Sequence, residues 1–257
     1  MLKKLVLFDL SSLRRRVMPL IFSMLLTALL SLLVVLSGTL LPLGDAKLVI
    51  SDLLTAVLYL IILAFFVLLF LAILQIFLHY YRSFFTSEGY FTFMIPAARE
   101  QLFLSKVLSG LLFALLIFFA AVLSVTIGVL LPFEIAMRTE DLSFLSVLLR
   151  SLFDGVTPLS VIDLLIATCA QIMTAYTAIT MGALFFRKRK LLGALLFYLV
   201  LTLAVLFLRT LGMLLFLAIT YDSEIYTNIL SILLWITVSV FSYLFSRTLL
   251  GQKLNLT

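Results

Sequence analysis

The chain has 257 residues, of which 65% are hydrophobic and only 12% are charged, whereas soluble domains are about half apolar and about a quarter charged. This composition excludes an ordinary soluble globule, because too few polar side chains remain to face water. The net charge of +6 comes from short Lys and Arg clusters rather than from one continuous basic face, which argues against nucleic acid as a partner. Such clusters are typical of segments that flank membrane spans and contact anionic lipid headgroups.

Residues 1–16 carry apolar side chains at helical spacing, with the basic residues away from them. The stripe consists of Leu2, Val6, Leu10, Leu13 and Val17. This pattern predicts a helix that lies in the cytoplasmic membrane interface before the chain turns into the bilayer. A frayed basic leader is the alternative interpretation.

Six apolar runs are long enough to cross a hydrocarbon core, which needs about 20 residues at helical rise. They lie at residues 18–43, 53–79, 103–131, 160–186, 191–219 and 227–246. We expect helices, because backbone N–H and C=O groups in lipid must be satisfied within each segment. The predicted fold is therefore an all-α membrane protein with a single transmembrane domain over residues 1–257.

The distribution of basic residues predicts the orientation, because Lys and Arg are retained on the cytoplasmic side. With both termini inside, fourteen Lys and Arg residues, Lys106 among them, fall in the cytoplasm. Only Lys47, Arg138 and Arg150 fall outside, and Arg209 lies within a span. The first apolar run is too long for a cleaved signal peptide, so we expect it to remain as a span.

The segment from 80 to 106 is the longest joint on the predicted cytoplasmic side, and it is crowded with aromatic side chains. Rings outside the spans need a surface to bury against, either the lipid interface or a partner protein. Gly89 permits a bend, and Pro96 disfavours helix at Ile95. The pattern predicts a short helix between two bends.

This joint contains a recognisable motif. It comprises Tyr81-Arg82, then Ser87 to Phe93 (SEGYFTF), then Ile95 to Leu102 (IPAAREQL), then Ser105-Lys106. The series resembles the first cytoplasmic loop of bacterial ABC type-2 (ABC-2) transporter permeases, which has a basic aromatic lead-in, an E-G-Y-L-T-x-x-L-P core and a following S-K. Phe91 replaces the usual Leu, and Met94-Ile95 stands where Thr-Leu is common. The motif covers about a tenth of the chain.

The resemblance implies a mechanism and a set of partners. The loop would carry a coupling helix that docks on a separate cytoplasmic ATPase, and the permease would pair with a second copy or a sister permease in a bacterial plasma membrane. The residues that the resemblance assigns to this ATPase coupling are Phe85, Glu88, Gly89, Tyr90, Phe91, Pro96 and Arg99. The alternative, in which the rings only anchor the loop among lipid headgroups, stays open.

The chain carries no G-x-x-x-x-G-K-[ST] phosphate cradle, so ATP and Mg²⁺ are expected on the partner ATPase and no cofactor on this chain. Its single His and single Cys, Cys169, exclude a His-rich metal site, and no hydrolase motif is present, so the chain is not expected to be an enzyme by itself. Energy could instead come from an ion gradient, which makes a secondary transporter or channel the rival function.

Polar residues inside the predicted spans are relevant to the hypothesis of a secondary transporter or channel. Asp163 and Arg209 lie at similar predicted depth, so they form a structural pair or a transport site, or else Asp163 lies at the external interface. His79, at the inner end of the second span, is predicted to lie at headgroup level. The fourth span carries a stripe of small and polar residues, which predicts a packing face or a substrate path. Its candidate path residues are Gln171 and Thr174. Residues 141–154 predict a short helix on the outer surface.

Overall fold

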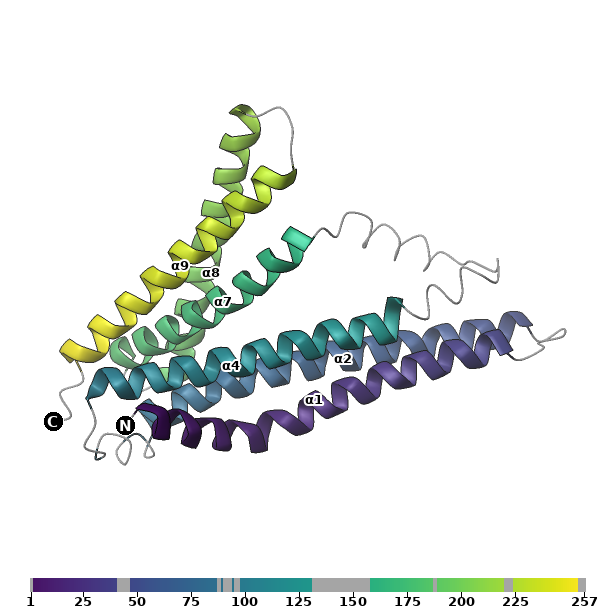
Figure 1. The fold of residues 1–257 in the computed structure, drawn as a ribbon, viewed down its shortest axis with the longest axis horizontal. Helices are drawn as coiled ribbons and strands as arrows, with labels where there is room; N and C mark the ends of the chain where they lie inside the picture. The colour runs from purple at the N-terminus through teal and green to yellow at the C-terminus, as the bar shows by residue number, and fades with distance from the viewer. Residues whose placement is uncertain are drawn as a thin grey trace. The chain divides into compact units, whose positions relative to one another are not determined.

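The regular structure of the chain is helical throughout the part that the structure describes (Figure 1). This computed structural model describes residues 2–40, 47–86, 89, 94, 98–130, 158–186, 189–219 and 224–253. The elements are α1 (Leu2–Leu40), α2 (Lys47–Phe85), α4 (Arg99–Val125), the π-helix η1 (Thr126–Leu130), α7 (Pro158–Phe185), α8 (Lys190–Ile219) and α9 (Glu224–Lys253). The predicted outer helix at 141–154 lies outside the described residues.

Six of the described helices are long and apolar enough to cross a membrane. The prediction of an all-helical fold with six spanning helices is confirmed at this level. An apolar run longer than a bilayer core can satisfy its backbone groups only as a helix or in a closed barrel, and the described residues contain no strand. The architecture is that of a multi-pass membrane protein.

Several helices extend beyond the predicted spans. α2 runs over Lys47–Phe85, around the predicted span 53–79, and α4 begins at Arg99, before the predicted span that starts at 103. The membrane-crossing bounds themselves stay predictions. α1 and α2 have 39 residues each, which is about 58 Å at helical rise and roughly twice a hydrocarbon core. An apolar run indicates only the part of a helix that lies in lipid. The backbone hydrogen bonds of the helix continue into the polar residues on either side of that run.

The N-terminal region is helical, as predicted, but it is not a separate helix. α1 continues through Pro19, although a proline inside a helix removes one backbone hydrogen bond and crowds the carbonyl four residues earlier. Buried positions follow one stripe along this helix, consisting of Asp9, Leu13, Val17, Ile21, Met24, Ala28 and Ser31. Protein therefore covers this face. An interfacial position for residues 2–16 stays a prediction.

The chain groups into two compact units, and several helices contribute to both. Unit 1 comprises residues 1–13, 76–115 and 157–257, and unit 2 comprises residues 14–75 and 116–156. In unit 2, η1 approaches α1 closely, since the Ser31 hydroxyl lies 2.9 Å from the Gly128 carbonyl oxygen. A Cβ at Gly128 would lie 3.1 Å from the Cα of Ala28, so glycine permits this contact.

In unit 1, α7 packs against both α8 and α9. Ala170 of α7 forms a buried cluster with Val205 of α8 and Trp235 of α9, and small residues let helices approach in this way. α7 also approaches α8 closely at Gly182, where a Cβ would lie 2.5 Å from the Cα of Ala194. Ala167 and Ala170 of the small-residue stripe thus take part in helix packing.

The first turns of α1 and the last turns of α9 lie at the same end of unit 1. Asp9 of α1 pairs with Lys106, and Arg247 Nη2 of α9 lies 2.6 Å from Glu100 Oε1, so both helices contact the start of α4. Lys190 at the start of α8 donates to the carbonyl of Phe85 at the end of α2, over 3.3 Å.

The approach of α7 and α8 predicts that Gly182→Ala lowers stability by about 1–3 kcal/mol, because the new methyl group meets backbone atoms that cannot rotate away. Unfolding of the purified protein in detergent micelles, followed by circular dichroism, measures the change. Gly212→Ala is the matched control, since a Cβ there would meet nothing within 4 Å. Equal stability of the two variants would contradict this account of the contact.

Candidate functional site

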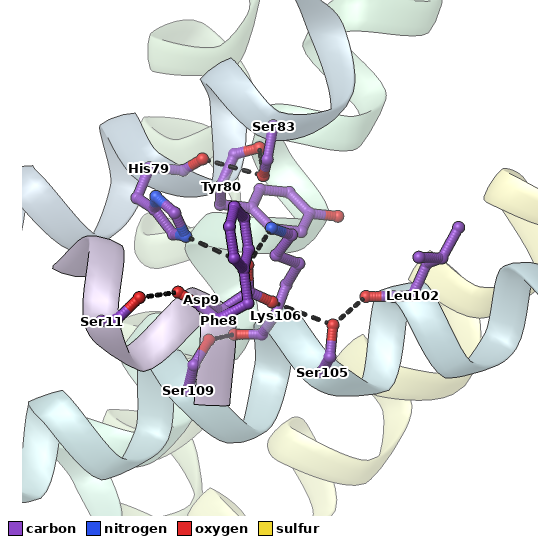
Figure 2. A network of polar contacts seen from close by, with 10 residues as sticks. All are labelled: Phe8, Asp9, Ser11, His79, Tyr80, Ser83, Leu102, Ser105, Lys106 and Ser109. Carbon is purple, nitrogen blue, oxygen red and sulfur yellow. Dashed lines mark hydrogen bonds and ion pairs between the residues drawn. The ribbon is translucent and has the colours of Figure 1, made fainter. Parts of the chain in front are cut away.

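A buried cluster of polar side chains joins α1, α2 and α4 at the end where these helices meet (Figure 2). Its members are Asp9, His79, Ser105 and Lys106, and we call it the Asp9 cluster. Asp9 lies on the buried stripe of α1, His79 lies in the last two turns of α2, and Ser105 and Lys106 lie in the second turn of α4. Each member is about two turns from the end of its helix, so all four side chains reach one level of the bundle.

The carboxylate of Asp9 is the acceptor at the centre of the cluster. Lys106 Nζ donates to Oδ1, and the Ser105 hydroxyl lies 3.0 Å from Oδ2. His79 Nε2 lies 3.8 Å from Oδ1, which is an ion-pair distance but too long for a hydrogen bond. That nitrogen is buried and has no hydrogen-bond partner.

The cluster is almost fully removed from solvent. The exposed fractions are 2% for Asp9, 6% for Lys106 and 8% for His79. An isolated charge at such a position is strongly unfavourable, and removing one partner of a buried ion pair costs about 3–5 kcal/mol. The ion pair therefore ties the orientation of α1 to that of α4.

Aromatic stacking connects the end of α2 to α7 beside this cluster. The ring of Tyr80 is parallel to that of Tyr176, with centroids 4.0 Å apart, and the Tyr80 hydroxyl lies 2.9 Å from Thr180 Oγ1. Thr180 uses its own proton toward the carbonyl of Tyr176, at 2.7 Å, so Tyr80 is the donor. Gly110 of α4 lies against the Tyr176 ring, where a side chain would collide with it.

The predicted coupling residues lie at the ends of α2 and α4 or between them. The carbonyl of Phe85 accepts from Lys190. Gly89 is buried, donates to the Thr86 carbonyl over 2.9 Å, and has no room for a Cβ, which would lie 2.6 Å from the Phe84 carbonyl oxygen. The close approach to Phe84 explains why a glycine stands at this position, and a bend at Gly89 stays a prediction. Arg99 begins α4, and its side chain is outside the described residues, as are Glu88, Tyr90, Phe91 and Pro96.

A second polar group lies where α7, α8 and α9 pack together. Arg209 Nη2 is 3.6 Å from Asp163 Oδ2, and the Arg209 guanidinium lies over the Trp235 ring, 5.7 Å from its centroid. Asp163 and Trp235 are buried, whereas the Arg209 side chain is 32% exposed. The two residues proposed as a pair are therefore close together, and the indole ring provides a cation–π contact.

The two candidate path residues of the fourth span have protein partners. Tyr198 of α8 donates to Gln171 Oε1 over 3.3 Å. Thr174 is buried and donates to the Gln171 carbonyl over 2.8 Å. Among the described contacts, both side chains take part in packing and internal hydrogen bonding.

Sequence reasoning missed Asp9 and did not pair it with His79 or Lys106. Both residues are buried against Asp9, while the headgroup level predicted for His79 and the cytoplasmic side predicted for Lys106 stay predictions. The available signal was the spacing of Asp9, Leu13 and Val17 on one helical face, which makes Asp9 the acidic member of an otherwise apolar stripe. The described residues hold no group of His, Cys, Asp or Glu suited to a metal ion.

Comparison with known proteins adds no assignment. No protein-family model matches the chain, and no curated protein or solved structure matches it significantly. The resemblance to ABC type-2 permeases therefore rests on the residues of the motif.

The hydrogen bond between Tyr80 and Thr180 predicts that Tyr80→Phe lowers stability by about 0.5–1.5 kcal/mol, because one buried bond is lost while the stacked ring remains. Denaturant unfolding in micelles measures the difference. Tyr59→Phe is the matched control, since Tyr59 is 54% exposed on the same helix. A larger loss for Tyr59→Phe than for Tyr80→Phe would contradict the assignment.

The contact between Arg209 and Trp235 can be measured directly, because Trp235 is the single tryptophan of the chain. Arg209→Ala uncovers one face of the indole, so quenching of its fluorescence by brominated lipid or acrylamide should increase. Arg82→Ala, which removes an exposed cation from α2, should leave quenching unchanged. Unaltered quenching in Arg209→Ala would mean that the guanidinium does not cover the ring.

Proposed function

We propose that the chain is the membrane-spanning permease subunit of an ATP-binding cassette exporter of the ABC type-2 kind. It would lie in a bacterial plasma membrane with both termini cytoplasmic, and it would pair with a second copy or a sister permease. A separate cytoplasmic subunit would bind ATP and Mg²⁺. The motif at residues 81–106 and the six apolar helices support this proposal together.

One structural observation carries the mechanism. The two helices on either side of residues 86–98 are both bonded to other helices near those residues. α2 is held to α7 by the Tyr80 stack and hydrogen bond, and α4 is held to α1 by the Lys106–Asp9 pair. A displacement of the joint would therefore move several helices rather than bend one loop.

Energetics sets the condition for coupling. ATP can shift the helices only if the two conformations of the permease differ in their contacts with the ATPase. The aromatic and acidic side chains of the motif, chiefly Glu88 and Tyr90, would make those contacts, since aromatic anchors are enriched at interface hot spots. Gly89 supports this role, because a glycine lets the chain pack closely against Phe84 at the end of α2.

The apolar character of the helices supports an amphipathic or hydrophobic substrate, such as a lipid, a hydrophobic peptide or a drug. Export is the direction that the resemblance implies. Transport of candidate fluorescent amphiphiles into inside-out vesicles would identify the class.

A gradient-driven secondary transporter or channel is the second candidate function. The observation that favours it is the buried set of titratable groups formed by Asp9, His79 and Lys106, because intramembrane ionisable residues often serve ion pathways. Purification after gentle detergent extraction separates the two proposals. An exporter brings down a nucleotide-binding subunit, whereas a gradient-driven transporter works in vesicles without ATP.

The proposed joint predicts that Glu88→Lys and Tyr90→Ala uncouple ATP hydrolysis from transport while leaving membrane insertion intact. Loss of one anchor at a hot spot weakens the binding free energy by about 2 kcal/mol or more. The amount of copurified ATPase and the transport per ATP hydrolysed should therefore each fall about tenfold or more. The measurements are the copurified ratio of the two subunits and the export of a fluorescent amphiphile.

Matched controls for these variants lie elsewhere on the chain. Tyr59→Ala removes an exposed ring from α2, and Glu224→Lys reverses an acid at the start of α9, on the side that the charge pattern places outside. Both should retain the ATPase. Normal export by Glu88→Lys and Tyr90→Ala would remove the assignment of the joint.

A further inference from the structure

We propose that Asp9 is a positioning residue that makes the first turns of α1 a third helix of the coupling joint, so that this part of α1 moves together with the adjoining ends of α2 and α4. The inference rests on the proposed function, and it adds an element outside the motif to the coupling mechanism. Residues 2–13, 76–85 and 98–115 all belong to unit 1.

The start of α1 has few other attachments. Within residues 2–13 the buried side chains are those of Asp9 and Leu13, while Phe8 is 71% exposed and Leu7 is 56% exposed. One leucine contributes non-directional packing, which allows the helix to slide or rotate. A charge-assisted hydrogen bond is directional, so the carboxylate determines how these turns are placed against α4.

The Asp9 carboxylate lies between α2 and α4. It bonds to Ser105 and Lys106 of α4, and Figure 2 shows that His79 of α2 points toward it from the other side. The gap of 3.8 Å to His79 Nε2 is about 1 Å longer than a hydrogen bond. A small relative movement of α2 and α4 would therefore change how many bonds Asp9 makes, and this links the position of α1 to the joint.

The test uses the full chain copurified with its ATPase and reconstituted in lipid nanodiscs. A spin label is placed at the exposed position 7 through Leu7→Cys, with Cys169→Ser removing the natural thiol. Nucleotide is trapped on the ATPase with ATP, Mg²⁺ and vanadate. In the otherwise unchanged protein, trapping should alter the mobility of the label, because the start of α1 moves with the joint.

Two variants test whether Asp9 makes the start of α1 move with the joint. In Asp9→Asn, hydrogen exchange of the amides in residues 5–13 should rise about tenfold or more, because Lys106 is left as an unpaired buried charge. The double variant Asp9→Asn/Lys106→Met leaves neither charge of the pair, so it should keep stability close to that of the unaltered chain. It should nevertheless lose the response of the label to trapping. Lys4→Met and Ser11→Ala, both exposed on the same helix, should retain the response.

The outcomes separate the two proposals. If no nucleotide-binding subunit copurifies with the unaltered chain, the proposed function fails. If the subunit copurifies and the folded double variant still shows the full label response, the role of Asp9 is overturned. The absence of any label response in the unaltered complex also overturns it, because the start of α1 would then not follow the joint. Should Asp9→Asn fail to fold, the double variant alone gives the decision.

Discussion

The arrangement of the helices around the joint depends on a carboxylate that is buried with a cation beside it. Asp9 is 2% exposed, and a lone carboxylate at that position would lose its hydration without compensation. Lys106 and Ser105 replace the lost hydration. This requirement determines the rotation of α1, because turning the helix by one residue moves a side chain by about 100°. Leu13 and Val17 share the face of Asp9 and are buried with it.

The packing of α7, α8 and α9 relies on a different principle. There the helices meet through small residues, with Gly182 against the backbone of α8 and Ala170 beside Val205 and Trp235. Close approach gains dispersion contacts, which replace the hydrophobic effect as the driving force in lipid. Tyr80 and Tyr176 connect this packed group to the end of α2. Unit 1 thus combines a directional charge contact with close helix packing.

The sequence predicted the spans and part of the site, and the reasons for its failures are physical. The apolar runs and the small residues of the fourth span depend on local chemistry, so they could be read directly. The stripe on residues 1–17 was assigned through Leu10, whereas the buried face passes through Asp9. Adjacent residues differ by about 100° around a helix, and a 3.6-residue period over four turns does not distinguish these two choices. The partner of Asp9 is 97 residues away.

What the sequence determined by itself is which segments form the six described helices that are long and apolar enough to cross a membrane. Apolar length is a property of a local stretch, and it is compared with a bilayer thickness that is the same for every span. Only the tertiary structure decided which polar side chains are partners, since it places His79 and Lys106 beside Asp9. Such pairing depends on the rotation and register of helices that meet from distant parts of the chain, and no local pattern specifies these.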